Sequence, residues 1–320
     1  MRVTHLTLVF FFIYFFSYPL FFPPHSLEGH EAMSEYALCW NKQTPRIVSG
    51  GSDHLVVMWD LNDHSTTLLK TKNHKTTTKW NHKKTLQPKQ IFKGHSDTVE
   101  DVTFHPTDPA GNIVCSVGDD RCLIVWDARV SDLLVARVEN AHKEDINCID
   151  WNNHDPSSLV SGSSDGTIHQ YDYRMLNASP NRAVVATYDQ PGLGNITNIQ
   201  WSPHDARYFA SAGDDGAISV WDSHAVDKDS TLLFRHSGHR ASIVDFDWNS
   251  KSPWTMVSMS DDSQNPRLGG GTMQVWRLSD LLFQSGADFE QKLVGALDKD
   301  KEFQQKLELE GGSNKKQRKA

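Results

Sequence analysis

Cysteine is scarce in this sequence, and its four cysteines lack the spacing of a metal or redox site. Cys39, Cys115, Cys122 and Cys148 contain no Cys-x-x-Cys pair, and each lies in an apolar run such as NIVCSV or INCIDW. We interpret them as small core residues in a reducing compartment, and not as disulfide partners or zinc ligands.

Catalytic signature motifs are also missing. The sequence contains no His-Glu-x-x-His and no Gly-x-Ser-x-Gly, and Gly269-Gly270-Gly271 is not followed by Lys and Ser or Thr. The segment HSGH at His236–His239 has no further metal ligands nearby in the sequence, so we interpret it as a loop. We therefore expect a protein that is not an enzyme and that uses no cofactor and no metal.

Acidic and basic residues are unevenly distributed. The 320-residue chain has a formal charge of −8, yet residues 64–93 contain eight lysines and no acid, and the last ten residues contain four basic groups. Setting those eight and four positive charges aside leaves −20 on the rest of the chain. Because an acidic body attracts basic partners and repels phosphates, we expect no direct sequence-specific DNA binding.

Residues 6–22 form a long apolar run, LTLVFFFIYFFSYPLFF. Its length is typical of a signal-peptide core, which keeps secretion or membrane anchoring as an alternative. However, Pro19 interrupts the run, no small-x-small cleavage site follows it, and a repeat motif begins at Gly29. We therefore expect residues 1–26 to be an atypical segment that stands in place of a different native N-terminus.

A short motif recurs along the chain. Trp-Asp or a close variant occurs at Trp59, Trp126, Tyr171, Trp221 and Trp276, and upstream histidines that follow Gly or Ala occur at His30, His95, His142 and His239. Five repeats are readable, near residues 29–60, 94–127, 141–172, 190–222 and 238–277. A repeat length of roughly 40 to 50 residues indicates a β-propeller.

Ser, Asp and Trp keep a constant spacing within the repeats. The first repeat has Ser49, Asp53 and Trp59, and the second has Ser116, Asp120 and Trp126. Alternating runs such as VEDVTF and CLIVWD predict short antiparallel strands, four per blade. Because buried polar groups need partners, we predict that the Trp indole, the Ser hydroxyl, the His ring and the turn Asp bond to one another in each blade.

These residue types also occur in catalytic triads. A set that is repeated in every blade serves the fold, whereas a catalytic set occurs once, so we favour the structural interpretation. In the fourth repeat Gly192 stands where the spacing expects histidine, and we expect a looser loop there.

The sequence thus predicts an all-β WD-repeat propeller over residues 27–280. Residues 64–93 have neither a strand nor a helix period, and we interpret them as a mobile loop, with a nucleic-acid arm as the alternative. Residues 281–320 change to a helical pattern and end in KKQRK, which is typical of a nuclear import signal or of a solvated chain end.

Four longer strings carry a resemblance to a known family: GHSDTVEDVTFHP, CSVGDDRCLIVWDAR, LLFRHSGHRASIVDFDWN and GGGTMQVWRLSDLLF. They resemble the retinoblastoma-associated histone-binding WD-repeat proteins, and the GGGT insertion resembles their plant FVE/MSI-type subgroup. The resemblance covers about residues 27–285. It implies a propeller of seven blades, of which five are readable here, preceded by a long N-terminal helix.

The resemblance also implies a function. Members of this family are scaffold subunits of histone deacetylase assemblies, Polycomb-type repressors and nucleosome assembly factors. We therefore expect a nuclear, non-catalytic protein that binds histones H3 and H4 and contributes to transcriptional repression.

Two binding regions follow from the resemblance. Glu35, Glu100 and Asn147 stand five residues after a histidine and match family positions that face a histone H3 or cofactor peptide, and Tyr36 adds an aromatic contact. Leu233, Phe234 and Leu282 match part of one wall of a histone H4 helix pocket, although the loop VDKDST lacks the family's prolines.

Acidic residues flank the motif histidines and the turn aspartates. The set comprises Glu31, Asp97, Glu144 and Asp145 beside the histidines, and Asp119, Asp214 and Asp261 beside the turn aspartates. Because the polar network brings both groups to the same edge of each blade, we expect an acidic rim that pairs with Arg and Lys of an extended peptide. The alternative is a rim that only solvates the protein.

The string Trp126-Asp127-Ala128-Arg129 resembles the WDxR box by which some WD-repeat proteins dock on the adaptor of a cullin-RING ubiquitin ligase. Because Trp-Asp is structural in any repeat, only Arg129 carries additional information. The alternative function is therefore a substrate receptor of such a ligase.

Overall fold

The computed structural model describes residues 25–30, 35–63, 84–130, 133–179, 182–189, 192–225, 231–261 and 271–278. The chain divides into two compact units, one formed by residues 1–248 and 258–274 and the other by residues 249–257 and 275–320. The predicted apolar run 6–22, residues 64–83 of the Lys/Thr-rich segment and the helical tail 281–320 lie outside the described residues. Among the described residues, no helix has the length and apolar character needed to cross a membrane.

Within this described part of the chain, antiparallel sheets of three or four strands follow one another, and we number them blades 1 to 5. Blade 1 contains β2 (Glu35–Trp40), β3 (Arg46–Gly51), β4 (Leu55–Asp60) and β6 (Gln90–Lys93). Blade 2 contains β7 (Val99–Phe104), β8 (Ile113–Gly118), β9 (Leu123–Asp127) and β10 (Leu134–Val138). Blade 3 contains β11 (Ile146–Trp151), β12 (Ser158–Ser163), β13 (Ile168–Asp172) and β14 (Val184–Tyr188), with the short helix α2 (Tyr173–Leu176) after β13.

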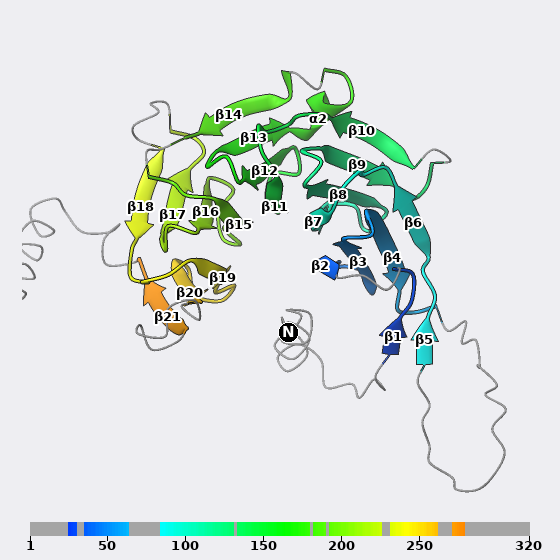
Figure 1. Cartoon of the computed structure of the whole chain (residues 1–320), viewed down its shortest axis with the longest axis horizontal. Helices are drawn as coiled ribbons and strands as arrows, with labels where there is room; N and C mark the ends of the chain where they lie inside the picture. The colour runs from blue at the N-terminus through cyan, green and yellow to red at the C-terminus, as the bar shows by residue number, and fades with distance from the viewer. Residues whose placement is uncertain are drawn as a thin grey trace, which may run out of the picture. The chain divides into compact units, whose positions relative to one another are not determined.

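The remaining blades repeat this order. Blade 4 contains β15 (Ile196–Trp201), β16 (Tyr208–Gly213), β17 (Ile218–Asp222) and β18 (Leu232–His236), and blade 5 contains β19 (Ile243–Trp248), β20 (Thr255–Ser260) and β21 (Thr272–Arg277). The first strand of each blade contacts the first strand of the next, in the order β2, β7, β11, β15 and β19. Figure 1 shows these strands innermost, facing a common centre, with β6, β10, β14 and β18 on the outside. This is the predicted propeller pattern.

The C-terminal part of the Lys/Thr-rich segment 64–93 forms strands and not the predicted loop. Its last residues form β5 (Lys84–Leu86) and β6, the latter being the fourth strand of blade 1. Phe92 of β6 is fully buried and packs on Trp126, with 5.5 Å between ring centroids. The run QIFK is too short for its period to be readable, so only packing against the next blade identifies it as a strand. β5 pairs in parallel with β1 (His25–Leu27).

Large aromatic side chains fill the space between neighbouring blades. Trp126 of blade 2 packs against Val102 and Phe92, and Trp221 of blade 4 packs against Tyr188, with 5.5 Å between ring centroids. The four cysteines are free thiols, as predicted, and Cys115, Cys122 and Cys148 are buried. Each blade therefore buries one face against its neighbour, and removal of this apolar area from water is the main stabilising term.

Blade 2 contains the complete predicted polar network. The indole Nε1 of Trp126 donates to Ser116 Oγ at 2.8 Å, and Ser116 Oγ lies 2.7 Å from His95 Nε2. His95 Nδ1 lies 3.0 Å from Asp120 Oδ1. Ser116 is fully buried, so its hydroxyl satisfies two groups that have no access to water.

Blade 1 departs from the prediction at its tryptophan. His30 bonds Ser49 Oγ at 2.7 Å and Asp53 Oδ2 at 2.8 Å as expected, but Trp59 Nε1 donates to the Glu28 carbonyl at 2.8 Å. The predicted link from Trp59 to Ser49 is therefore wrong, because the backbone before the histidine supplies a nearer acceptor. Blade 3 uses Tyr171, whose hydroxyl lies 3.3 Å from Ser161 Oγ.

Blade 4 compensates for its missing histidine with an arginine. Arg235 Nη2 of β18 donates to the Gly192 carbonyl at 2.8 Å and pairs with the turn residue Asp215. The guanidinium thus ties the loop before β15 to the turn, as histidine does elsewhere. This anchor comes from the outer strand of the blade, so the spacing used to find the histidines did not reveal it.

We predict that Ser116→Ala destabilises the protein more than Ser49→Ala. The first change leaves Trp126 Nε1 and a His95 ring nitrogen without partners, whereas the second leaves only a His30 ring nitrogen. Each buried unsatisfied group costs about 1 to 3 kcal/mol, so Ser116→Ala is expected to lower the free energy of unfolding by about 2 kcal/mol or more. Urea unfolding of both variants measures the difference, and equal losses would contradict the assigned networks.

Candidate functional site

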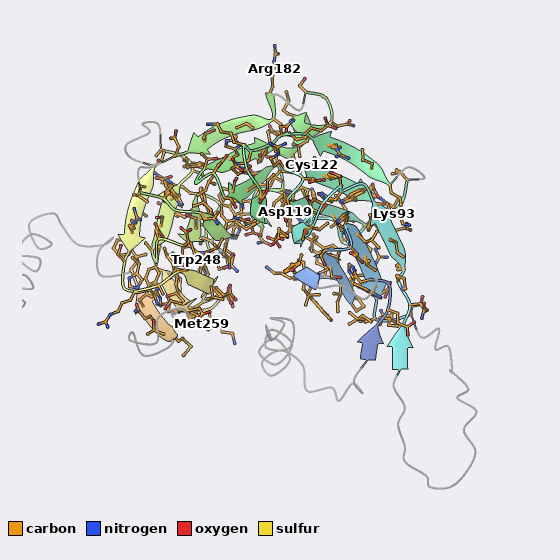
Figure 2. The ribbon with its side chains drawn as sticks, in the orientation of Figure 1. Lys93, Asp119, Cys122, Arg182, Trp248 and Met259 are labelled. Atoms are coloured by element: carbon orange, nitrogen blue, oxygen red, sulfur yellow. The ribbon has the colours of Figure 1, made fainter. Side chains whose placement is uncertain are left out.

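The first strands of the blades and the turns between the second and third strands meet at one rim. The backbone N–H of the turn residue donates to the residue that precedes the first strand: Asp119 to Thr98 at 3.0 Å, Ser164 to Asp145 at 3.0 Å, Asp214 to Asn195 at 3.1 Å and Asp261 to Ser242 at 3.2 Å. The described acidic neighbours Asp97, Asp119, Glu144, Asp145, Asp214 and Asp261 therefore share this rim, which we call the acidic rim, whereas Glu31 lies outside the described residues. In Figure 2 the labelled Asp119 lies on the inner side of the sheets, whereas Lys93 and Arg182 lie on the outer side.

Each of the first four inner strands has a β-bulge close to this rim. The extra residue is Tyr36 in β2, Glu100 in β7, Asn147 in β11 and Thr197 in β15. A bulge leaves one residue unpaired and re-aims its side chain. Blades 1 to 4 therefore present one equivalent side chain each to the centre of the unit.

The bulge residues line a common hollow. Its volume is about 340 Å³, and its walls are Tyr36, Glu100, Asn147, Asn195 and Thr197. Tyr36 exposes 52% of its surface here, which leaves its ring available for contact. The structure thus brings together three of the residues predicted from the sequence and adds two polar residues from blade 4.

The register of blade 1 corrects one prediction. Leu38 pairs with Ser49 as Val102 pairs with Ser116, so Tyr36, and not Glu35, is the equivalent of Glu100. Blade 1 has one more residue between its histidine and its bulge, and counting from the histidine therefore misplaces the site by one. The backbone of Glu35 pairs with Gly51, and its side chain lies outside the described residues.

Sequence reasoning missed Asn195 and Thr197. Thr197 stands five residues after Gly192, the same spacing that identified Glu100 and Asn147. The signal was present, but the absence of histidine at Gly192 hid the repeat. Asn195 follows Leu193 and Gly194 in the loop before β15, and only the hollow reveals its position.

Several carboxylates lie near Glu100, which lines one side of the hollow. Burial, followed by the charges of Asp119, Asp145 and Asp97, raises the pKa of Glu100 to about 7. Burial and the same neighbours Asp145 and Asp97 also raise the pKa of Asp119. These negative charges repel one another, so a cationic group placed among them is electrostatically stabilised.

The opposite wall is neutral and is held by bonds between blades. Asn147 Nδ2 donates to the Ile196 carbonyl at 2.7 Å, and Thr197 Oγ1 lies 3.2 Å from the Ile243 carbonyl and 3.3 Å from the Ala212 carbonyl of its own blade. Deeper along the same strands, backbone N–H groups donate to side chains of the preceding blade: Ile149 to Asp101 at 2.8 Å, Trp201 to Asp150 at 2.6 Å and Trp248 to Gln200 at 3.3 Å. The inner strands therefore form a rigid support for the hollow.

The other predicted peptide contacts are spread along the acidic rim. Asp214 and Asp261 are exposed in the turns of blades 4 and 5 and do not line the hollow. Of the proposed histone H4 wall, Leu233 and Phe234 are half-buried neighbours on β18, where Leu233 is the extra residue of a bulge. Leu282 lies outside the described residues.

Arg129 lies just after the end of β9, at the edge of blade 2 opposite the acidic rim. Its guanidinium pairs with Asp127 through Nε at 2.9 Å and Nη2 at 2.7 Å, and 56% of the side chain is exposed. Blade 3 repeats this pair with Arg174 and Asp172, at 2.9 Å and 2.7 Å. Sequence reasoning missed the second arginine because Tyr171 replaces the tryptophan that marks the box.

Comparison with known families accounts for these repeats. The family model described as WD domain, G-beta repeat matches residues 21–60, 86–127, 135–172 and 183–222. The chain belongs to the WD-repeat family. The fifth predicted repeat, near residues 238–277, lies beyond the matched ranges, in agreement with its lengthened turn before Trp276.

Curated relatives support the closer resemblance. The chain is 42% identical over 293 residues to the WD-40 repeat-containing protein MSI4 of Arabidopsis thaliana, covering 87% of this chain and 56% of MSI4. It is 32% identical over 269 residues to MSI3 of the same plant, covering 82% of this chain and 57% of MSI3. The chain thus spans a little over half the length of these relatives. They confirm the predicted resemblance to the plant MSI-type proteins and support a WD-repeat scaffold.

We predict that Asn147→Ala destabilises the protein although the side chain lines a surface hollow. The change removes the donor to the Ile196 carbonyl, and Ile196 is only 1% exposed. The loss is expected to be about 1 to 3 kcal/mol in the free energy of unfolding. Asn62→Ala, at an exposed position, is the control, and a similar small effect of both variants would contradict the inter-blade bond.

Proposed function

We propose that this WD-repeat scaffold binds an extended basic peptide across the acidic rim, with a histone H3 tail as its ligand. The observation that carries the proposal is the hollow at the inner strands, where Glu100 lies with the exposed ring of Tyr36, and where the charges of Asp119, Asp145 and Asp97 act on Glu100. Carboxylates bind Arg and Lys through charge-assisted hydrogen bonds, and an aromatic face adds a cation–π contact.

The neutral wall suits the backbone of the same peptide. Asn195 and Thr197 offer amide and hydroxyl groups opposite the carboxylates. An extended chain exposes alternating N–H and C=O groups, so one wall pairs with its backbone while the other pairs with its basic side chains. Inner strands joined by hydrogen bonds hold both walls in place before binding, which lowers the entropic cost of association.

The wider assignment follows from the family. We propose a nuclear, non-catalytic subunit of a chromatin-repressive complex, of the histone deacetylase, Polycomb or nucleosome assembly type, with histones H3 and H4 as partners. The similarity to MSI4 and MSI3, the acidic body and the basic KKQRK end support it. The His–Ser networks recur with structural partners in blades 1, 2, 3 and 5, so they supply no argument for catalysis.

A second function is favoured by the arginine pairs at the opposite rim. Arg129 and Arg174 hold the same bidentate geometry in adjacent blades, and 56% and 73% of these side chains are exposed. A planar guanidinium fixed in this way presents its free edge to carboxylates of a partner. We propose this pair as the docking point for a cullin-RING ligase adaptor, if the protein acts as a substrate receptor.

We predict that removing charge from the acidic rim weakens binding of a histone H3 N-terminal peptide. Asp119→Asn with Asp145→Asn is expected to lower the affinity about tenfold or more at low salt, and the difference should shrink as salt screens the charges. Isothermal titration calorimetry measures both effects. Asp155→Asn with Asp205→Asn removes the same charge from turns on the opposite rim as a control. An affinity within twofold of the unchanged protein at low salt would contradict the acidic-rim proposal.

We predict that Arg129→Ala abolishes co-purification of the ligase adaptor and leaves histone H3 peptide binding unchanged. The two rims are separate surfaces of the blades, so a change at one does not alter the charge of the other. Affinity purification and peptide titration of the same variant give both readouts. Loss of both activities would mean that Arg129 supports the fold and is not a docking residue.

A further inference from the structure

The bulge residues of blades 3 and 4 line the hollow and also lie within hydrogen-bond distance of the next blade. Asn147 donates to the carbonyl of Ile196, the first residue of the next inner strand. Thr197 Oγ1 lies 3.2 Å from the carbonyl of Ile243, the first residue of the strand after that, and 3.3 Å from the Ala212 carbonyl of its own blade. Both residues are therefore placed to donate a hydrogen bond from one blade to the next at the same place in the repeat.

Glu100 occupies this position in blade 2, and the equivalent acceptor is the carbonyl of Ile146, the first residue of β11. An ionised carboxylate only accepts hydrogen bonds, whereas a protonated one donates through its O–H. Within the part of the chain that the structure describes, no hydrogen bond of the Glu100 side chain is formed. The link that joins blades 3, 4 and 5 is thus left open between blades 2 and 3.

We propose that Glu100 is a two-state residue at the blade 2–blade 3 junction: protonated, it donates to the Ile146 carbonyl and closes the junction; ionised, it leaves the junction open and holds a cationic side chain of a ligand. The second state rests on the peptide-binding function proposed above. Peptide binding at high pH and closure of the junction at low pH would therefore exclude each other at Glu100.

The surroundings of Glu100 suit such a residue. The titratable groups around it are Tyr36 across the hollow, Asp97 before β7, Asp119 in the β8–β9 turn, Asp145 before β11 and the adjacent Asp101 of β7, whose pKa is also raised to about 7. Burial and the charges of Asp119, Asp145 and Asp97 bring the pKa of Glu100 to about 7. Protonation and ionisation are therefore both accessible near neutral pH.

The effect on stability has a defined sign. A carboxyl whose pKa is higher in the folded than in the unfolded protein stabilises the fold in its protonated form. This contribution is complete below the ordinary pKa of 4.5 and is lost as the pH rises through about 7. Glutamine is a permanent donor without charge, so Glu100→Gln keeps the closed junction at every pH.

The test is thermal unfolding of the full chain and of Glu100→Gln between pH 5 and pH 8. The variant is expected to melt at the same temperature as the unchanged protein at pH 5 and about 2 °C or more above it at pH 8. Comparison at each pH cancels the titration of groups that do not interact with Glu100. Glu144→Gln removes the same charge from an exposed position beside the acidic rim, and we expect no pH-dependent difference for this control. A difference for Glu100→Gln that does not change with pH would overturn the proposal.

A reciprocal variant tests the position itself. Asn147→Asp has the same shape but loses its donor when ionised, so its destabilisation is expected to grow with pH and to be relieved on acidification. Because the ordinary pKa of Asp is about 3.9, the variant is compared with the unchanged protein at pH 3 and at pH 8. If the loss is the same at both, the bulge position does not act through donation and the proposal fails.

Peptide binding provides a third test, of the ionised state of Glu100. One pH unit on either side of a pKa of about 7 changes the ionised fraction of Glu100 about tenfold. The affinity for a histone H3 N-terminal peptide is therefore expected to fall by up to about tenfold from pH 8 to pH 6, and Glu100→Gln should remove most of this dependence. An unchanged pH dependence in the variant would overturn the ligand-bound state of Glu100. Absence of peptide binding at every pH would refute the proposed function, while the melting experiments would still decide the junction.

Discussion

The structure depends on the bond between the loop histidine and the serine of the second strand. In blade 2 this bond joins His95 to Ser116, and the same serine hydroxyl receives the Trp126 indole from the third strand. One buried hydroxyl thus fixes the loop, the second strand and the third strand together. Without this hydroxyl, two polar groups, the Trp126 indole N–H and one His95 ring nitrogen, would be buried without partners, at a cost that is large relative to the marginal stability of a folded protein.

The bond also determines the chemistry of the acidic rim. The same His95 ring also bonds the turn residue Asp120, so the loop is held against the turn and the acidic neighbours of both segments face the same side of the blade. The first strand then starts at a fixed place, and its bulge residue faces the hollow. A fold-stabilising network and a binding surface are therefore consequences of one short motif, and the residues that vary within the motif set what each blade offers: an aromatic ring at Tyr36, a carboxylate at Glu100, an amide at Asn147 and a hydroxyl at Thr197.

Variation between blades also decides how rigidly neighbours are joined. Where the bulge residue donates, as at Asn147, the next blade is bonded at the rim as well as packed in the core. Where it is a carboxylate, as at Glu100, packing and the deeper bond from Ile149 to Asp101 hold the junction. At the acidic wall, the bulge residue forms no hydrogen bond to the next blade within the described residues, because the same charge that attracts a basic ligand removes the donor.

The sequence by itself determined the repeat, the strand pattern, the free cysteines and the polar network of blade 2, because these follow from local spacing and from the need to pair buried polar groups. Tertiary structure alone decided the rest. The β6 strand, the Glu28 acceptor of Trp59, Arg235 in place of a histidine and the shift from Glu35 to Tyr36 depend on which groups the chain brings together across blades. Spacing along the chain does not record such contacts, since a bulge or one extra loop residue changes the partner without changing the motif.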